Sequence, residues 1–145
     1  MTAPESRQAA IGRLHSERCS CVIVSGDSVT VCHGRGVSDL YRIYSSQPEV
    51  LSGAFIADKV IGKGAAALMI AGGVAGVYTD LISVPALELF RSVGIEPEFV
   101  RCVPNIINRT GDGICPVETL CRDCASASEC LPLIADFIEK MNYKH

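Results

Sequence analysis

The sequence of 145 residues has no tryptophan, only 6% aromatic residues and no long hydrophobic run. Its longest apolar segment, residues 64–78, is rich in glycine and alanine, and it is too short to span a bilayer. The first residues include Glu5, Arg7 and Arg13 and lack the apolar core of a signal peptide. We therefore expect a cytoplasmic protein that does not interact with membranes.

An excess of charge of either sign is also absent. Thirteen Lys and Arg residues oppose sixteen Asp and Glu residues, which gives a net charge of -3 without a basic cluster. Proteins that bind nucleic acids or anionic membranes usually carry such a cluster, so neither partner is expected. The hydrophobic content of 48% and the chain length predict one globular domain over residues 1–145. A small molecule is the expected partner, and the sequence leaves self-association open.

Cysteine, in contrast, is abundant, with eight residues in the chain. Without an export signal these residues are expected to be thiols, core residues or metal ligands rather than disulfides. The C-terminal segment 115–130 contains four of them, Cys115, Cys121, Cys124 and Cys130, and leads into a final helix. The central C-x2-C has metal-ligand spacing, but the outer gaps match no zinc or iron–sulfur pattern. We keep zinc, an iron–sulfur cluster or redox chemistry here as alternatives to inert buried thiols.

Hydrophobic spacing predicts the order of helices and strands. A capping box at Thr2 and Glu5 begins a helix that runs to about residue 16. β-Branched runs at 21–24 and 29–32 form a hairpin, and a helix covers 37–44. Strands at 52–57, 77–82 and 98–103 then alternate with helices at about 58–72, 85–93 and 129–141. This order predicts a three-layer α/β/α domain with a mixed five-stranded sheet, in which ligands usually bind at the carboxyl ends of strands.

Two strand-to-helix junctions, Ala57-Asp58-Lys59 and Ser83-Val84-Pro85-Ala86, lead to a family resemblance. A hairpin, a helix and a βαβα unit with junctions at these places look like the cytidine deaminase-like fold. Zinc deaminases carry His-x-Glu at the first junction and Pro-Cys-x-x-Cys at the second. Pro85 matches, but Ala86 and Leu89 stand where the cysteines would be, and neither binds a metal. We therefore expect neither zinc at these junctions nor deamination of cytidine.

A closer resemblance covers about residues 14–118. This segment resembles a small, functionally uncharacterised prokaryotic family of zinc-less cytidine deaminase-like proteins. The matching pieces are Gly36-Val37, residues 57–63, residues 82–88 and the block Asn108-Arg109-Thr110-Gly111-Asp112-Gly113-Ile114-Cys115-Pro116-Val117-Glu118. The resemblance implies the fold and no particular reaction, because one fold hosts many functions.

The first junction supplies three candidate ligand-binding residues. Asp58, Lys59 and Lys63 are expected to begin the third helix, where free backbone N–H groups favour anions. The lysines would hold a phosphate or carboxylate there, and the alternative is that Asp58 caps the helix while both lysines are solvated. Ser83 either caps the next helix or contacts a ligand hydroxyl.

The block at 108–118 supplies the other candidates. Its glycine-rich loop carries Asn108 and Arg109, whose planar guanidinium suits an anion, and the block ends at Glu118. Cys115 is the candidate nucleophile, but no histidine is close in sequence, so a buried inert thiol is the alternative.

Three functional hypotheses result from these candidates. The first is a zinc-independent protein that binds a small anionic or nucleotide-like molecule through Asp58, Lys59, Lys63, Ser83, Asn108, Arg109 and Glu118. The second is an enzyme of unknown reaction that uses Cys115 with Lys59 or Lys63. The third is a metal or redox module on the C-terminal cysteines.

Overall fold

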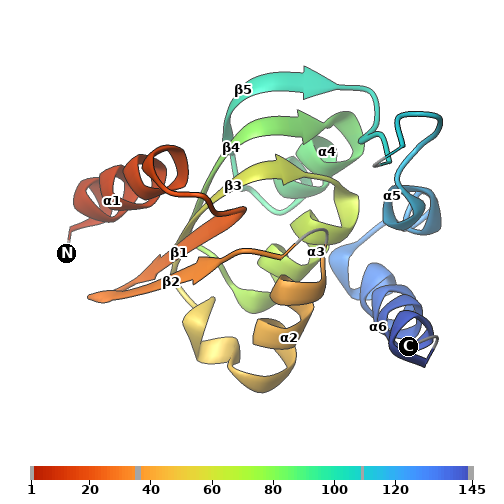
Figure 1. Ribbon diagram of the computed structural model, residues 1–145, viewed down its shortest axis with the longest axis horizontal. Coiled ribbons are helices and arrows are strands. Elements are labelled where there is room, and N and C mark those ends of the chain that lie inside the picture. The colour runs from red at the N-terminus through yellow and green to blue at the C-terminus, as the bar shows by residue number, and fades with distance from the viewer. Residues whose placement is uncertain (1, 35–36, 109, 144–145) are drawn as a thin grey trace.

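The protein is an α/β domain with a mixed five-stranded sheet and six α-helices, seen in a computed structural model that describes residues 2–34, 37–108 and 110–143 (Figure 1). The strands are β1 (Cys21–Ser25), β2 (Ser28–Cys32), β3 (Phe55–Ile61), β4 (Gly76–Ser83) and β5 (Glu98–Val103). The helices are α1 (Ala3–Ser16), α2 (Ser38–Ser46), α3 (Lys63–Gly72), α4 (Val84–Ser92), α5 (Pro116–Leu120) and α6 (Ala127–Tyr143), with a 3-10 turn η1 (Pro48–Val50). Within the described residues no helix is long and apolar enough to cross a membrane.

The N-terminal third forms the antiparallel side of the sheet. The expected capping box at Thr2 and Glu5 begins α1, and the two hairpin strands meet at a turn where Gly26 has a φ of 58°. Both strands join the sheet in the order β2-β1-β3-β4-β5, with β1 antiparallel to β3. Helix α1 packs on one face of this part of the sheet, where Leu14 and Ala57 are fully buried.

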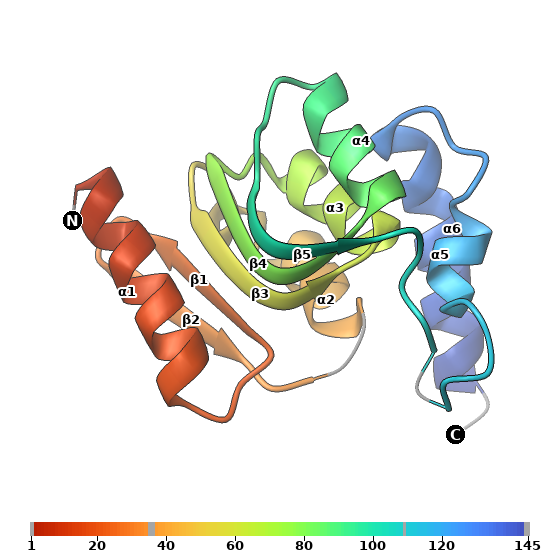
Figure 2. The same cartoon turned by 90° about the horizontal axis from the view of Figure 1, so that it is seen from above.

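The other face of the sheet carries the main core. β3, β4 and β5 are parallel and are connected through α3 and α4, which lie on the same face as α2 and α6 (Figure 2). α3 is the central helix of this layer, because it contacts α2, α4, α5 and α6. The alanine and glycine residues of α3 allow its neighbours to pack closely against it. A Cβ on Gly64, for example, would collide with Val117 of α5.

The main difference from the sequence-based prediction is the junction after β3. The strand continues to Ile61, so Asp58 and Lys59 lie within it, and α3 begins at Lys63. The prediction that Asp58 and Lys59 begin a helix is therefore wrong. The reason is the β-branched pair Val60 and Ile61, which extends the parallel pairing with Leu81 and Ile82 of β4.

Smaller differences concern exposure and short elements. Val93 and Met141, which the helical spacing places on buried faces, are 51% and 42% exposed. The five-residue helix α5 and the turn η1 were not predicted, since elements this short have no periodic pattern. Gly36 and Arg109, both part of the resemblance, lie outside the described residues.

Candidate functional site

A pocket of about 660 Å³ opens beside the carboxyl end of β3. Its wall combines the hairpin strands, the start of α2, the start of α3 and the segment 106–118. Six candidates from the sequence line it: Asp58, Lys59, Lys63, Asn108, Cys115 and Glu118. A volume of this size is typical of small-molecule sites, which are mostly apolar with a few polar groups.

The N-termini of α3 and α4 converge on one buried carboxylate, that of Glu118. Its Oε1 accepts a hydrogen bond of 2.7 Å from the Lys63 backbone N–H and one of 3.0 Å from the Ser83 hydroxyl. Its Oε2 accepts from the Ile106 N–H at 2.5 Å. Ser83 in turn caps α4 by accepting from the Ala86 N–H at 3.3 Å, which is one of the two roles that the sequence allows for it. The anion favoured at these two helix ends is thus a side chain of the protein itself.

This arrangement does not fit a catalytic zinc ion. Such an ion needs three protein ligands and an open position. The residues at the two helix starts are Gly62, Lys63, Ser83 and Ala86, and the carboxylate between them already accepts three hydrogen bonds. Gly62 is part of this packing, because a Cβ there would lie 3.2 Å from the Glu118 Oε1.

Lys63 lines the pocket, but its ammonium group is directed to the C-terminal segment. The side chain is 7% exposed, and Nζ donates to the backbone oxygens of Arg122 at 3.2 Å and Cys124 at 2.5 Å. These carbonyls lie in the turn after α5, so Lys63 connects the start of α3 to this turn. The Lys63 ammonium group thus bonds to backbone oxygens rather than facing the pocket. Lys59 is the more accessible of the two lysines at the pocket.

We expect Lys63→Met to lower the free energy of unfolding by about 2–3 kcal/mol, because the backbone carbonyls of Arg122 and Cys124 lose a charged donor. Urea denaturation at neutral pH measures the change. Lys140→Met is the matched control: Lys140 is 74% exposed in an ion pair with Asp136, and its loss should change stability by less than about 0.5 kcal/mol. Equal effects of the two substitutions would contradict the structural role of Lys63.

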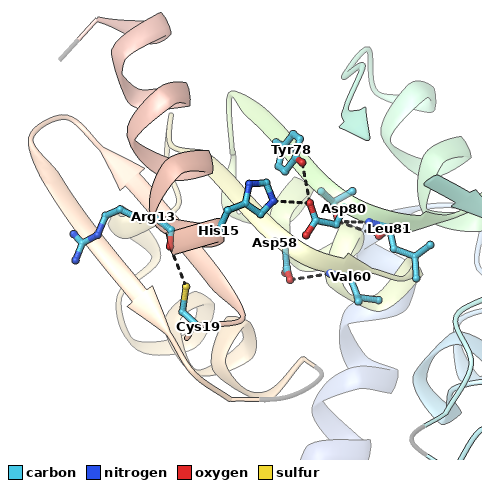
Figure 3. A network of polar contacts seen from close by, with 9 residues as sticks. Arg13, His15, Cys19, Asp58, Val60, Tyr78, Asp80 and Leu81 are labelled. Carbon is cyan, nitrogen blue, oxygen red and sulfur yellow. Dashed lines mark hydrogen bonds and ion pairs between the residues drawn. The ribbon is translucent and has the colours of Figure 1, made fainter. Parts of the chain in front are cut away.

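Asp58 occupies the middle of β3 and faces the pocket. It lies opposite Cys21 of β1 and Thr79 of β4, and one carboxylate oxygen accepts from the Val60 N–H at 3.3 Å (Figure 3). Burial raises the pKa of Asp58 to about 7, although hydrogen bonds from the backbone and from Cys21 oppose this rise. At neutral pH the protonated form of this carboxyl group, which can donate a hydrogen bond, and the ionised form, which only accepts, are therefore both populated.

The loop after β5 closes one side of the pocket with an internal network. A bridge pairs Ile107 with Ile114, and the Asn108 amide bonds to Asp112 at 3.0 Å and accepts from the Gly111 N–H at 2.9 Å. Asn108 thus stabilises the loop that lines the pocket. Cys115, half-buried, follows the loop at the start of α5, and neither His15 nor His33 lines the pocket beside it.

Three of the four C-terminal cysteines, Cys121, Cys124 and Cys130, lie together. Cys130 is close enough to Cys121 and Cys124 for the thiols to affect one another, and its interaction with Cys121 lowers the pKa of Cys121. Burial is the main cause that raises the pKa of Cys124 to about 11. Within the described ranges, no group of three or more His, Cys, Asp or Glu side chains is arranged to hold a metal ion.

Sequence reasoning missed a polar network on the opposite face of the sheet. His15 Nε2 and the Tyr78 hydroxyl both lie 2.8 Å from the same oxygen of Asp80, and the two rings meet edge to face (Figure 3). This network joins α1 to β4. Tyr78 and Asp80 lie 63 and 65 positions after His15 in the sequence, so no local spacing could have indicated the network.

Sequence reasoning also missed Cys21 and Cys32. Both line the pocket, each is 4% exposed, and they lie directly opposite one another in the hairpin. The predicted hairpin contains both residues, and counting from its turn would have paired them.

Comparisons with known proteins agree with this fold. The family model described as "TM1506: Domain of unknown function (DUF1893)" matches residues 9–138. The structure is similar to that of a DUF1893 family protein (TM1506) from Thermotoga maritima, with a TM-score of 0.85 and 20% sequence identity. The match covers 94% of this chain and 92% of that chain. None of the curated proteins matches the chain.

Proposed function

This chain belongs to the DUF1893 family, a domain of unknown function, and we propose that it binds a small nucleoside-like molecule in the pocket beside β3. The observation that carries this proposal is the pocket of about 660 Å³ with the Asp58 carboxyl group in its wall. A carboxyl group that both donates and accepts near neutral pH matches the paired donors and acceptors of a heterocyclic amide.

The charges around the pocket favour a weakly charged ligand. Glu118 already satisfies the two helix N-termini, and the Lys63 ammonium bonds to backbone carbonyls. Among the described residues that line the pocket, Lys59 is the accessible cation, while Asp39 and Asp58 add negative charge. A ligand phosphate would therefore interact with Lys59, and the base and sugar would occupy the apolar part of the pocket. Binding of this kind requires no metal or other cofactor.

We also propose that the fold is related to the cytidine deaminase-like proteins. The order of hairpin, helix and parallel βαβαβ unit supports this relationship, as does the approach of the α3 and α4 N-termini to one another. Deamination of cytidine is not part of the proposal, because the residues at these helix ends do not fit a catalytic zinc ion.

Thermal unfolding with a panel of nucleosides and nucleotides tests the proposed function. A ligand at about one hundred times its dissociation constant should stabilise the domain by about 2.7 kcal/mol and raise Tm by roughly 5–10 °C. Asp58→Asn should weaken every binder, whereas Lys59→Ala should weaken nucleotides and spare nucleosides. Lys140→Ala is the exposed control. If no panel member raises Tm, or if Asp58→Asn leaves binding unchanged, the proposal is wrong.

A further inference from the structure

Two cysteines and a carboxyl group meet on the hairpin side of the pocket. Cys21 and Cys32 are direct partners in the antiparallel pairing of β1 with β2, and Cys21 is also the partner of Asp58 on its other side. All three residues line the pocket, and the two cysteines are each only 4% exposed. The three side chains therefore share one face of three adjacent strands.

This placement suits a disulfide bond. Directly opposed residues of antiparallel strands have Cα atoms about 4.5–5.5 Å apart, within the range of about 4.4–6.8 Å that disulfides span. Directly paired residues project from the same face of a sheet, and both cysteines line the pocket, so their sulfur atoms lie on the same side. Bond formation thus requires little movement of the backbone.

The positions of the two cysteines in the sheet give them different roles. Cys21 lies between Cys32 and Asp58, whereas Cys32 is on the edge strand β2. The interaction between the two thiols lowers the pKa of Cys32 and, together with burial, raises the pKa of Cys21. Cys32 is consequently the better nucleophile, since the thiolate is the reactive form. Cys21 retains its proton and needs a base, and Asp58, its direct partner on β3, is placed to provide one.

We propose that Cys21, Cys32 and Asp58 form a dithiol site that reduces a small hydroperoxide, a chemistry beyond and independent of ligand binding in this pocket. The Cys32 thiolate attacks the peroxide oxygen that carries the hydrogen; the S–O bond forms and the O–O bond breaks. The leaving oxygen takes a proton from solvent, which replaces the proton that the Cys32 thiol released on ionisation, and becomes water or an alcohol. Cys32 is then a sulfenic acid. Cys21 attacks the Cys32 sulfur, Asp58 accepts the Cys21 proton, and the S–O bond breaks as hydroxide leaves and takes that proton. Two thiols and one hydroperoxide thus give one disulfide, one water and one water or alcohol.

Burial of the thiols defines the class of oxidant. A bulky disulfide substrate must align its S–S bond with the attacking sulfur, and side chains that are 4% exposed do not permit this approach. A small neutral hydroperoxide reaches the same sulfur through the pocket. The resulting disulfide is returned to the dithiol by an added dithiol reductant such as dithiothreitol.

The test uses the reduced full-length protein and one equivalent of hydrogen peroxide in buffer with a chelator. Free thiols are blocked with N-ethylmaleimide, and trypsin then cleaves after Arg18 and Arg35, which places Cys19, Cys21 and Cys32 in one peptide. We expect this peptide to lose two hydrogens through a bond between Cys21 and Cys32, about tenfold faster than the exposed Cys102 is oxidised. Cys19→Ser and Cys102→Ser are the matched controls and should leave the bond unchanged.

Dimedone, which traps sulfenic acids, tests the order of the steps. Cys21→Ser should accumulate the adduct on Cys32, and Asp58→Asn should increase this adduct at the expense of the disulfide. Oxidation of Cys102 before this peptide, or a bond that includes Cys19, would overturn the proposal. A disulfide that forms equally fast in Asp58→Asn would overturn the role of Asp58. Oxidation of the wild-type protein by itself shows whether the bond between Cys21 and Cys32 forms first, even if a variant at a buried position folds poorly.

Discussion

Replacing Glu118 with alanine is expected to lower the free energy of unfolding by about 3–5 kcal/mol, the largest effect of any single substitution that we predict. The side chain is 3% exposed, and its removal leaves three donors without an acceptor: the N–H groups of Lys63 and Ile106 and the hydroxyl of Ser83. The starts of α3 and α4 and the first part of the loop after β5 therefore lose the partner that they share.

Glu118→Gln separates the hydrogen bonds from the shape of the side chain. Glutamine keeps the volume and one carbonyl oxygen, but its NH₂ group cannot accept a hydrogen bond, so we expect a smaller loss of about 1–3 kcal/mol. Urea denaturation measures both variants, with the exposed Glu139→Gln of α6 as the control. A change below about 0.5 kcal/mol for Glu118→Ala would mean that the carboxylate does not hold these elements together.

The second large effect is a loss of stability with rising pH, which we expect to arise from Asp58. Burial raises the pKa of this group to about 7 in the folded protein, whereas an unfolded aspartate titrates near its ordinary value of about 3.9. Between these values the folded state binds more protons than the unfolded state, so stability decreases as pH rises. The decrease is small below the unfolded pKa and is complete above the folded pKa.

Asp58→Asn removes this titration. Relative to the wild type, the variant should gain about 2–3 kcal/mol of unfolding free energy between roughly pH 5 and pH 8. Urea denaturation of both proteins at these two values measures the gain, and Asp123→Asn, an exposed substitution, is the control. A constant difference between the wild type and Asp58→Asn across this range would show that the carboxyl group is already ionised at low pH.

Local sequence determined most of the secondary structure of this protein. The capping box at Thr2, the β-branched runs of the hairpin and the Ser83 cap each act within a few residues, so they can be read from the chain. The alternation of strands with helices then implied a mixed sheet with parallel crossovers, and the structure has one. Local preference failed at Asp58 and Lys59, where pairing with β4 keeps the chain extended to Ile61.

The chemistry of the candidate site was decided by tertiary structure. Sequence reasoning selected Ser83, Lys63 and Glu118 as ligand-binding residues, but it could not know that Glu118 would accept hydrogen bonds from the other two across 35 and 55 positions of sequence. The pairing of Cys21 with Cys32 and of Cys21 with Asp58 likewise depends on strand order. Residue type specifies which groups can bind, donate or ionise, but burial and neighbours set their partners and their pKa values, and both exist only once the sheet and its helices have assembled.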